Sequence, residues 1–98
     1  MALEWASSAD RHGIAHEDAI HALLHFVYEE REFEAPRPPA TVAADLFIGP
    51  QRSAVAPLLE VMLERRPPSG LWVFHVMALR PKFRDRMNAA LIARKEKP

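Results

Sequence analysis

The 98-residue chain contains no cysteine. It can therefore form neither a disulfide framework nor a thiolate-bound zinc module, and this absence fits a reducing compartment. Long hydrophobic runs are missing too, because the longest apolar-rich run, residues 71–79, is about half the length that a membrane helix requires. The first ten residues include Glu4 and Asp10 and lack both a basic start and an apolar signal core. We expect a cytoplasmic protein that does not associate with a membrane.

Glycine is scarce, with three residues in the whole chain. Three scattered glycines cannot build a glycine-rich phosphate loop, so nucleotide-dependent chemistry is not expected. No serine lies in a G-x-S-x-G elbow, which argues against a serine hydrolase. The serines fall in terminal or loop sequence: Ser7, Ser8, Ser53 and Ser69.

The composition is that of an ordinary globular protein, with 49% hydrophobic and 27% charged residues. A chain of this length suits one domain, residues 1–98. The net charge of zero hides an asymmetry. Residues 1–51 carry three basic and nine acidic side chains, whereas residues 52–98 carry ten basic and four acidic ones, giving formal charges of −6 and +6. The basic C-terminal segment is either a solvated helix surface or a surface that attracts a polyanion.

Hydrophobic periodicity predicts two helices and three strands. Ile20, Leu23, Leu24 and Val27 form one apolar stripe and predict a helix over residues 16–30. Pro81 is suited to a first helical turn, and the stripe that follows it predicts a basic helix over residues 81–93.

Between these helices, prolines make residues 34–41 a stiff connector. The predicted strands cover residues 42–49, 55–64 and 71–79. Their connecting loops are short, which favours an antiparallel meander. We therefore predict an α+β fold with an N-terminal helix, an antiparallel meander sheet of three or four strands and a C-terminal basic helix. The path of residues 27–34 is left open between helix and edge strand.

His75 is the main candidate for acid–base chemistry. The run that contains it is apolar on both faces, a pattern typical of a strand inside a sheet. His75 is its only polar side chain, and it is either a core histidine bonded to backbone or a proton-transfer group in a groove. Four cations follow closely in the sequence: Arg80, Lys82, Arg84 and Arg86.

The other four histidines raise the alternative of a metal site. His12 and His16, and separately His21 and His25, are spaced four residues apart, which on a helix would bring two imidazoles together. The sequence does not contain H-E-x-x-H, because the histidine after His16-Glu17 comes five residues after His16 instead of four. We predict no metal and no cofactor.

Several short motifs, in this order, resemble the BrnT-like family of bacterial toxins. They are R-H-G-I-x-x-E-D-A (11–19), L-F-I-G-P (46–50), L-L-E-V (58–61), V-F-H-V-M (73–77) and R-P-K-F-R (80–84). Members of that family are small ribonucleases with the RelE-type fold. The resemblance implies that His12 and Gly13 belong to a turn before the first helix, with His16, His21 and His25 on the helix surface. It places Met77 where the family has an arginine.

The resemblance implies a ribonuclease toxin of a type II toxin–antitoxin system. Such an enzyme needs no metal: a base deprotonates the ribose 2′-hydroxyl, which attacks the neighbouring phosphate while cations stabilise its charge. We predict His75, Arg80 and Lys82 as catalytic residues. Arg84, Arg86 and Arg52 are predicted to bind RNA.

The resemblance also implies a partner, a cognate antitoxin that covers the basic surface and through which oligomers could form. The alternative function is a non-catalytic interaction module that keeps the toxin-like fold. The methionine at position 77 favours this alternative.

Overall fold

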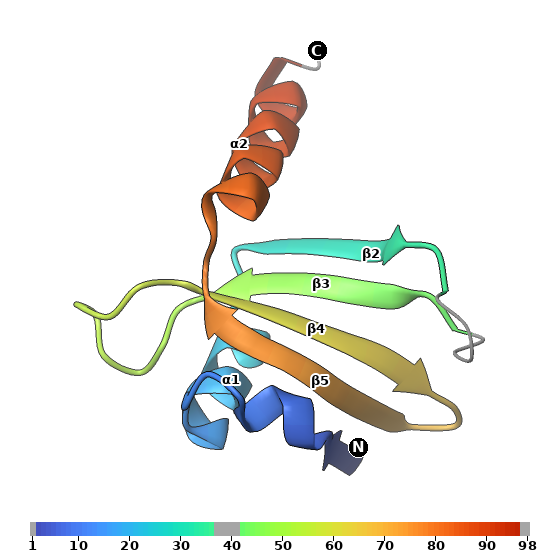
Figure 1. The fold of residues 1–98 in the computed structure, drawn as a ribbon. Helices are drawn as coiled ribbons and strands as arrows, with labels where there is room; N and C mark the ends of the chain where they lie inside the picture. The colour runs from blue at the N-terminus through green and yellow to red at the C-terminus, as the bar shows by residue number, and fades with distance from the viewer. Residues whose placement is uncertain (1, 37–41, 97–98) are drawn as a thin grey trace.

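A computed structural model describes residues 2–36 and 42–96 (Figure 1). The chain order is β1 (Ala2–Trp5), the 3₁₀ helix η1 (Ser7–Asp10), α1 (His16–Leu24), β2 (Tyr28–Glu34), β3 (Ala44–Gly49), β4 (Leu59–Arg66), β5 (Gly70–Ala78) and α2 (Pro81–Glu96). The strands form one sheet in the order β1-β5-β4-β3-β2. The predicted α+β class is confirmed.

The predicted sheet of three or four strands was too small, and its purely antiparallel pairing was wrong at one edge. The structure begins with a strand, not a helix, and β1 pairs parallel with β5, so the sheet has five strands and is mixed. The three predicted strands do form the antiparallel series β3-β4-β5. Strand β1 escaped detection because four residues at a sheet edge give too short an alternation to distinguish from loop sequence.

The first predicted helix is also too long. It ends at Leu24, and residues 28–34 form edge strand β2, which pairs antiparallel with β3 and answers the question left open for this segment. Phe26, Val27 and Tyr28 are aromatic or β-branched, so they favour extended backbone, and Val27 N–H already donates to the Ile48 carbonyl. Pairing with β3 therefore outweighs the helical periodicity.

The other element boundaries are close to those predicted. Strand β4 begins at Leu59 instead of residue 55, because Pro57 cannot donate to a strand ladder. Helix α2 runs one turn past residue 93. The predicted connector, residues 34–41, begins with Glu34, the last residue of β2, and its residues 37–41 lie outside the described part of the chain.

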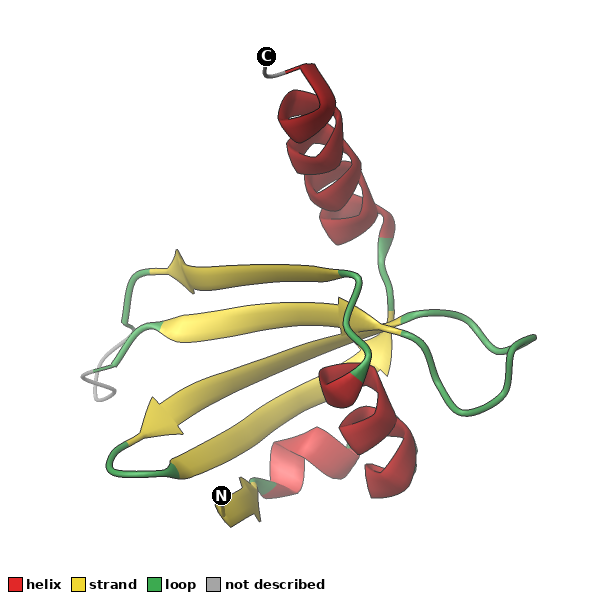
Figure 2. Ribbon diagram, turned by 180° about the vertical axis from the view of Figure 1, so that it is seen from behind, coloured by secondary structure: helices red, strands yellow, loops and turns green. Residues whose placement is uncertain are grey.

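Helix α1 covers one face of the sheet, here called the α1 face (Figure 2). The buried apolar side chains on this face form one cluster: Ala9, Ala19, Ala22, Phe47, Leu59, Val61, Leu63, Val73 and Val76. Gly49 allows the helix to approach closely, because a Cβ at this position would overlap the carbonyl group of Ala22. Each large side chain buried here contributes about 1.5–3 kcal/mol.

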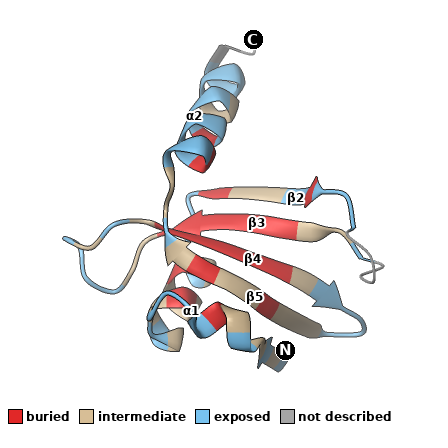
Figure 3. Ribbon diagram, viewed as in Figure 1, coloured by how far each residue is buried: buried red, intermediate tan, exposed pale blue. Residues whose placement is uncertain are grey.

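The opposite face, here called the α2 face, is covered less completely. Phe83 and Met87, in the first turns of α2, are buried against Met62 and the sheet. The helix then extends beyond edge strand β2, where most of it is exposed (Figures 1 and 3). Ile92 in this part of the helix is 56% exposed. Among the described residues, neither helix has the length and apolarity needed to cross a bilayer.

Candidate functional site

A β-bulge in β5 decides where His75 points. Val73 pairs with Leu63 and His75 pairs with Met62, so Phe74 is an extra residue with no partner in β4. Strict alternation predicts Val73 and His75 on one face. The bulge instead leaves Val73 in the α1-face core and turns His75 to the α2 face, beside Met62.

His75 lines a pocket of about 340 Å³ on the α2 face. Three cations from different segments share this pocket: Arg11 from the turn after η1, Arg80 from the link after β5, and Lys82 from α2. The remaining lining residues are Ser8, His12, Glu34, Met62, Phe74 and Phe83. The fold thus brings together all three residues predicted as catalytic, and it adds residues from the N-terminal segment that were not predicted.

Glu60 is buried beneath the pocket and contacts two of its residues, Arg80 and His75. Although it is a charged residue, it is 0% exposed. Its two carboxylate oxygens accept hydrogen bonds from Arg80, at 2.6 Å from Nε and 3.3 Å from Nη2. Burying a carboxylate requires such compensation, and the bidentate pair supplies it. The bond to Glu60 raises the pKa of Arg80, which therefore stays charged.

His75 is positioned beside this ion pair but is not bonded to it. Its Nε2 lies 3.8 Å from Glu60 Oε2, and no described residue gives this buried nitrogen a hydrogen-bond partner. Burial lowers the pKa of His75; Glu60 opposes this shift, while Arg80, His12 and Arg11 add to it. A neutral imidazole in this setting is suited to accept a proton.

The N-terminal segment, residues 6–12, is hydrogen-bonded to the backbone of β5 at the bulge. Ala6 N–H donates to the Val73 carbonyl at 2.9 Å, and Ser8 Oγ donates to the carbonyl of the extra residue, Phe74, at 2.6 Å. The first bond continues the parallel pairing of β1 with β5, and the second satisfies the carbonyl of the bulged residue. They also hold the following turn beside His75, so that the His12 and His75 rings meet edge to face with centroids 5.8 Å apart.

All three residues predicted to bind RNA lie outside the pocket. Arg84 is exposed on α2. Arg86 makes a bidentate ion pair with Glu30 of β2, and the hydrogen bonds from Arg86 lower the pKa of Glu30. Arg52, in the loop before β4, bonds Asp18 of α1 through its side chain and its backbone N–H.

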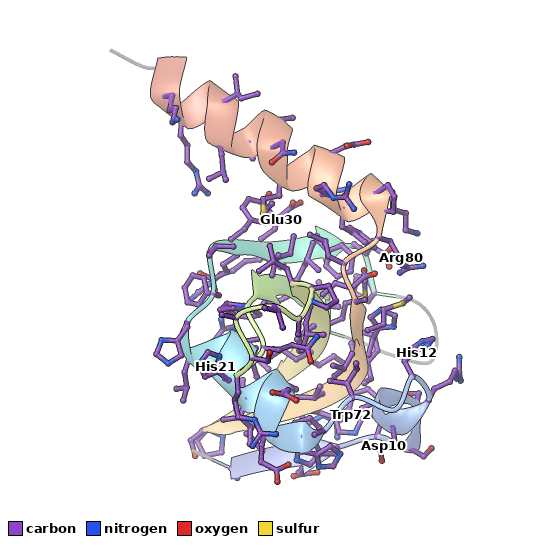
Figure 4. The ribbon with its side chains drawn as sticks, turned by 90° about the vertical axis from the view of Figure 1, so that its left-hand side faces the viewer. Asp10, His12, His21, Glu30, Trp72 and Arg80 are labelled. Carbon is purple, nitrogen blue, oxygen red and sulfur yellow. The ribbon has the colours of Figure 1, made fainter. Side chains whose placement is uncertain are left out.

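The four N-terminal histidines do not form a cluster. His16 stacks on Trp5 and bonds Asp10, whereas His21 bonds the Pro50 carbonyl and neighbours His25. Figure 4 shows His21 on the opposite side of the sheet from His12 and Arg80. Within the described residues, no group of three or more histidines and carboxylates could hold a metal ion. Gly13, next to His12, has a φ of 69° and opens the turn that leads into α1.

Sequence reasoning missed Glu60, Arg11 and His12 as members of the site. One signal for Glu60 was present: a single acid inside the apolar run L-L-E-V-M-L, with arginines downstream to pair with it. For Arg11 and His12 there was no comparable signal, because their position depends on the docking of η1 onto β5.

We compared the chain with known proteins in three ways. A scan against protein-family models, a search of curated proteins and a search of solved structures each found no match.

Proposed function

We propose that this protein is a metal-independent endoribonuclease and that the pocket at His75 is its active site. The observation that carries the proposal is the convergence of one desolvated imidazole with Arg11, Arg80 and Lys82. A base beside a cluster of cations matches what RNA cleavage by internal attack requires.

The proposed reaction uses the 2′-hydroxyl of RNA as the nucleophile. His75 accepts the hydroxyl proton, the oxygen attacks phosphorus, and the bond to the 5′-oxygen breaks. Arg80 has three N–H groups left after bonding Glu60, and with Arg11 and Lys82 these stabilise the charge that develops on the phosphoryl oxygens.

Purified protein incubated with an unstructured RNA in the presence of EDTA tests this proposal. We expect cleavage that yields 2′,3′-cyclic phosphate ends and persists without divalent metal. His75→Ala should lower the rate by at least about 100-fold, the usual size of a general-base contribution.

His25→Ala is the matched control, because His25 is exposed just after the end of α1 and lies outside the pocket. Its cleavage rate should equal that of the unaltered protein. Absence of cleavage by folded, unaltered protein, or undiminished cleavage by the His75 variant, would overturn the proposal. The first result would favour the non-catalytic interaction module.

We further propose that the enzyme acts as a BrnT-like toxin in the cytoplasm and binds a cognate antitoxin. The support is the motif resemblance together with the basic surface of α2, where Arg84, Arg94 and Lys95 are exposed. An acidic segment of the partner should bind this surface. Expression of the chain alone should arrest bacterial growth, and the His75→Ala variant should not.

Salt dependence tests the antitoxin interface. If opposite charges hold the partner on α2, raising the ionic strength should weaken binding of the protein encoded by the adjacent gene. Binding that is insensitive to salt would point to an apolar interface instead.

A further inference from the structure

The pocket contains a second imidazole that the proposed reaction has not used. His12 is exposed, lines the same pocket as His75, and comes from a different part of the chain. The bonds of Ala6 and Ser8 to the bulged backbone of β5 hold its segment in place. Figure 4 shows His12 and Arg80 on the same side of the sheet.

The two histidines differ in surroundings. The side chain of His75 is 20% exposed, and its Nε2 is buried beside Glu60. His12 lies in an exposed turn next to Arg11. A buried imidazole that stays neutral suits proton acceptance, whereas an exposed one can exchange protons with solvent and act as a donor.

We propose that His12 is the general acid of this site, paired with His75 as the base. The inference rests on the proposed ribonuclease activity and deepens it. The 2′-hydroxyl proton passes to His75 as the bond between the 2′-oxygen and phosphorus forms. The bond from phosphorus to the 5′-oxygen breaks, and this oxygen takes the proton of His12, leaving a cyclic phosphate and a 5′-hydroxyl.

A change of leaving group isolates the role of His12. An alkoxide leaving from RNA requires a proton, whereas 4-nitrophenolate leaving from uridine 3′-(4-nitrophenyl phosphate) does not. His12→Ala should therefore slow cleavage of RNA by about 100-fold. The same variant should cleave the aryl ester at nearly the rate of the unaltered protein, whereas His75→Ala should be defective on both substrates.

His16→Ala provides a matched control, since His16 stacks on Trp5 outside the pocket and should affect neither rate. Equal losses on RNA and on the aryl ester would overturn the role of His12 as an acid, and so would unchanged RNA cleavage by His12→Ala. An unaltered protein that cleaves neither substrate would overturn the ribonuclease proposal itself. The two failures are therefore distinguishable.

Discussion

The two faces of the sheet differ in the side chains that they bury. The α1 face is covered by a helix that approaches to backbone contact at Gly49 over an apolar core, and this face also buries a carboxylate, Asp45, which pairs with Arg65 at 2.6 Å. The α2 face buries a carboxylate, Glu60, and partly buries an imidazole, His75, beneath a helix whose buried side chains, Phe83 and Met87, lie in its first turns. Both faces contribute stability, and within the described residues only the α2 face places an imidazole beside its buried ion pair, where the proposed chemistry lies.

The largest loss of stability is expected for a substitution that adds a side-chain atom between α1 and the sheet. Gly49→Ala would drive a Cβ into the Ala22 backbone, and neither backbone is free to move without disturbing α1. We expect the free energy of unfolding to fall by about 3 kcal/mol in urea denaturation.

Gly13→Ala is the control for a glycine substitution. Its Cβ would meet nothing within 4 Å, so only the positive φ of 69° opposes it, at a cost of about 1 kcal/mol. Equal losses for the two variants would contradict the view that backbone contact limits the α1 face.

On the α2 face, the largest loss of stability is expected when the buried ion pair of Glu60 and Arg80 is broken. Arg80→Ala leaves the Glu60 carboxylate without its bidentate partner. We expect a loss of about 2–3 kcal/mol, below the usual range for a broken buried pair because the Arg80 side chain is 37% exposed. Chemical denaturation measures this loss.

The double variant Glu60→Gln/Arg80→Ala sharpens this prediction. Removing both charges should restore part of the stability, because the penalty comes from an uncompensated buried carboxylate. A double variant less stable than Arg80→Ala would show that the loss arises from packing.

A smaller effect is expected for the ion pair at the edge of the same face. Arg86 and Glu30 are 46% and 24% exposed, so water and salt screen their attraction. Arg86→Ala should cost less than about 1 kcal/mol, and salt should reduce the difference further. A loss of stability as large as that of Arg80→Ala would contradict the expectation that the exposed ion pair contributes less than the buried one.

The smallest effect should be a pH dependence of stability from His75, since a single partly exposed group produces it. Its pKa is lowered in the folded state, mainly by burial, so the unfolded chain binds the proton more readily. This contribution is fully present above about pH 6.5, the pKa of an unfolded histidine, and is lost as pH falls through the folded pKa. Thermal unfolding of the unaltered protein and of His75→Gln between pH 7.5 and pH 5 should show a decline that the variant lacks.

Local signals predicted the strong elements and missed the weak ones. The stripe Phe83, Met87, Ala90 and Leu91 predicted α2, and these side chains do pack on the α2 face. Strand β1 and the early end of α1 were not predicted, because short edge strands are stabilised by pairing with distant segments. Of the site, His75, Arg80 and Lys82 could be selected from their neighbours in sequence, whereas Arg11 and His12 lie more than sixty positions away.

The sequence by itself determined the α+β class, the three consecutive antiparallel strands and the presence of an imidazole within an apolar strand, because these follow from local periodicity and residue type. Only the tertiary structure decided which way that imidazole faces. One extra residue, Phe74, shifts the alternation of β5 relative to β4, and Ser8 of the N-terminal segment bonds the carbonyl of this residue. Side-chain direction in a strand has a period of two, so a single bulge moves His75 from the hydrocarbon core to the charged pocket.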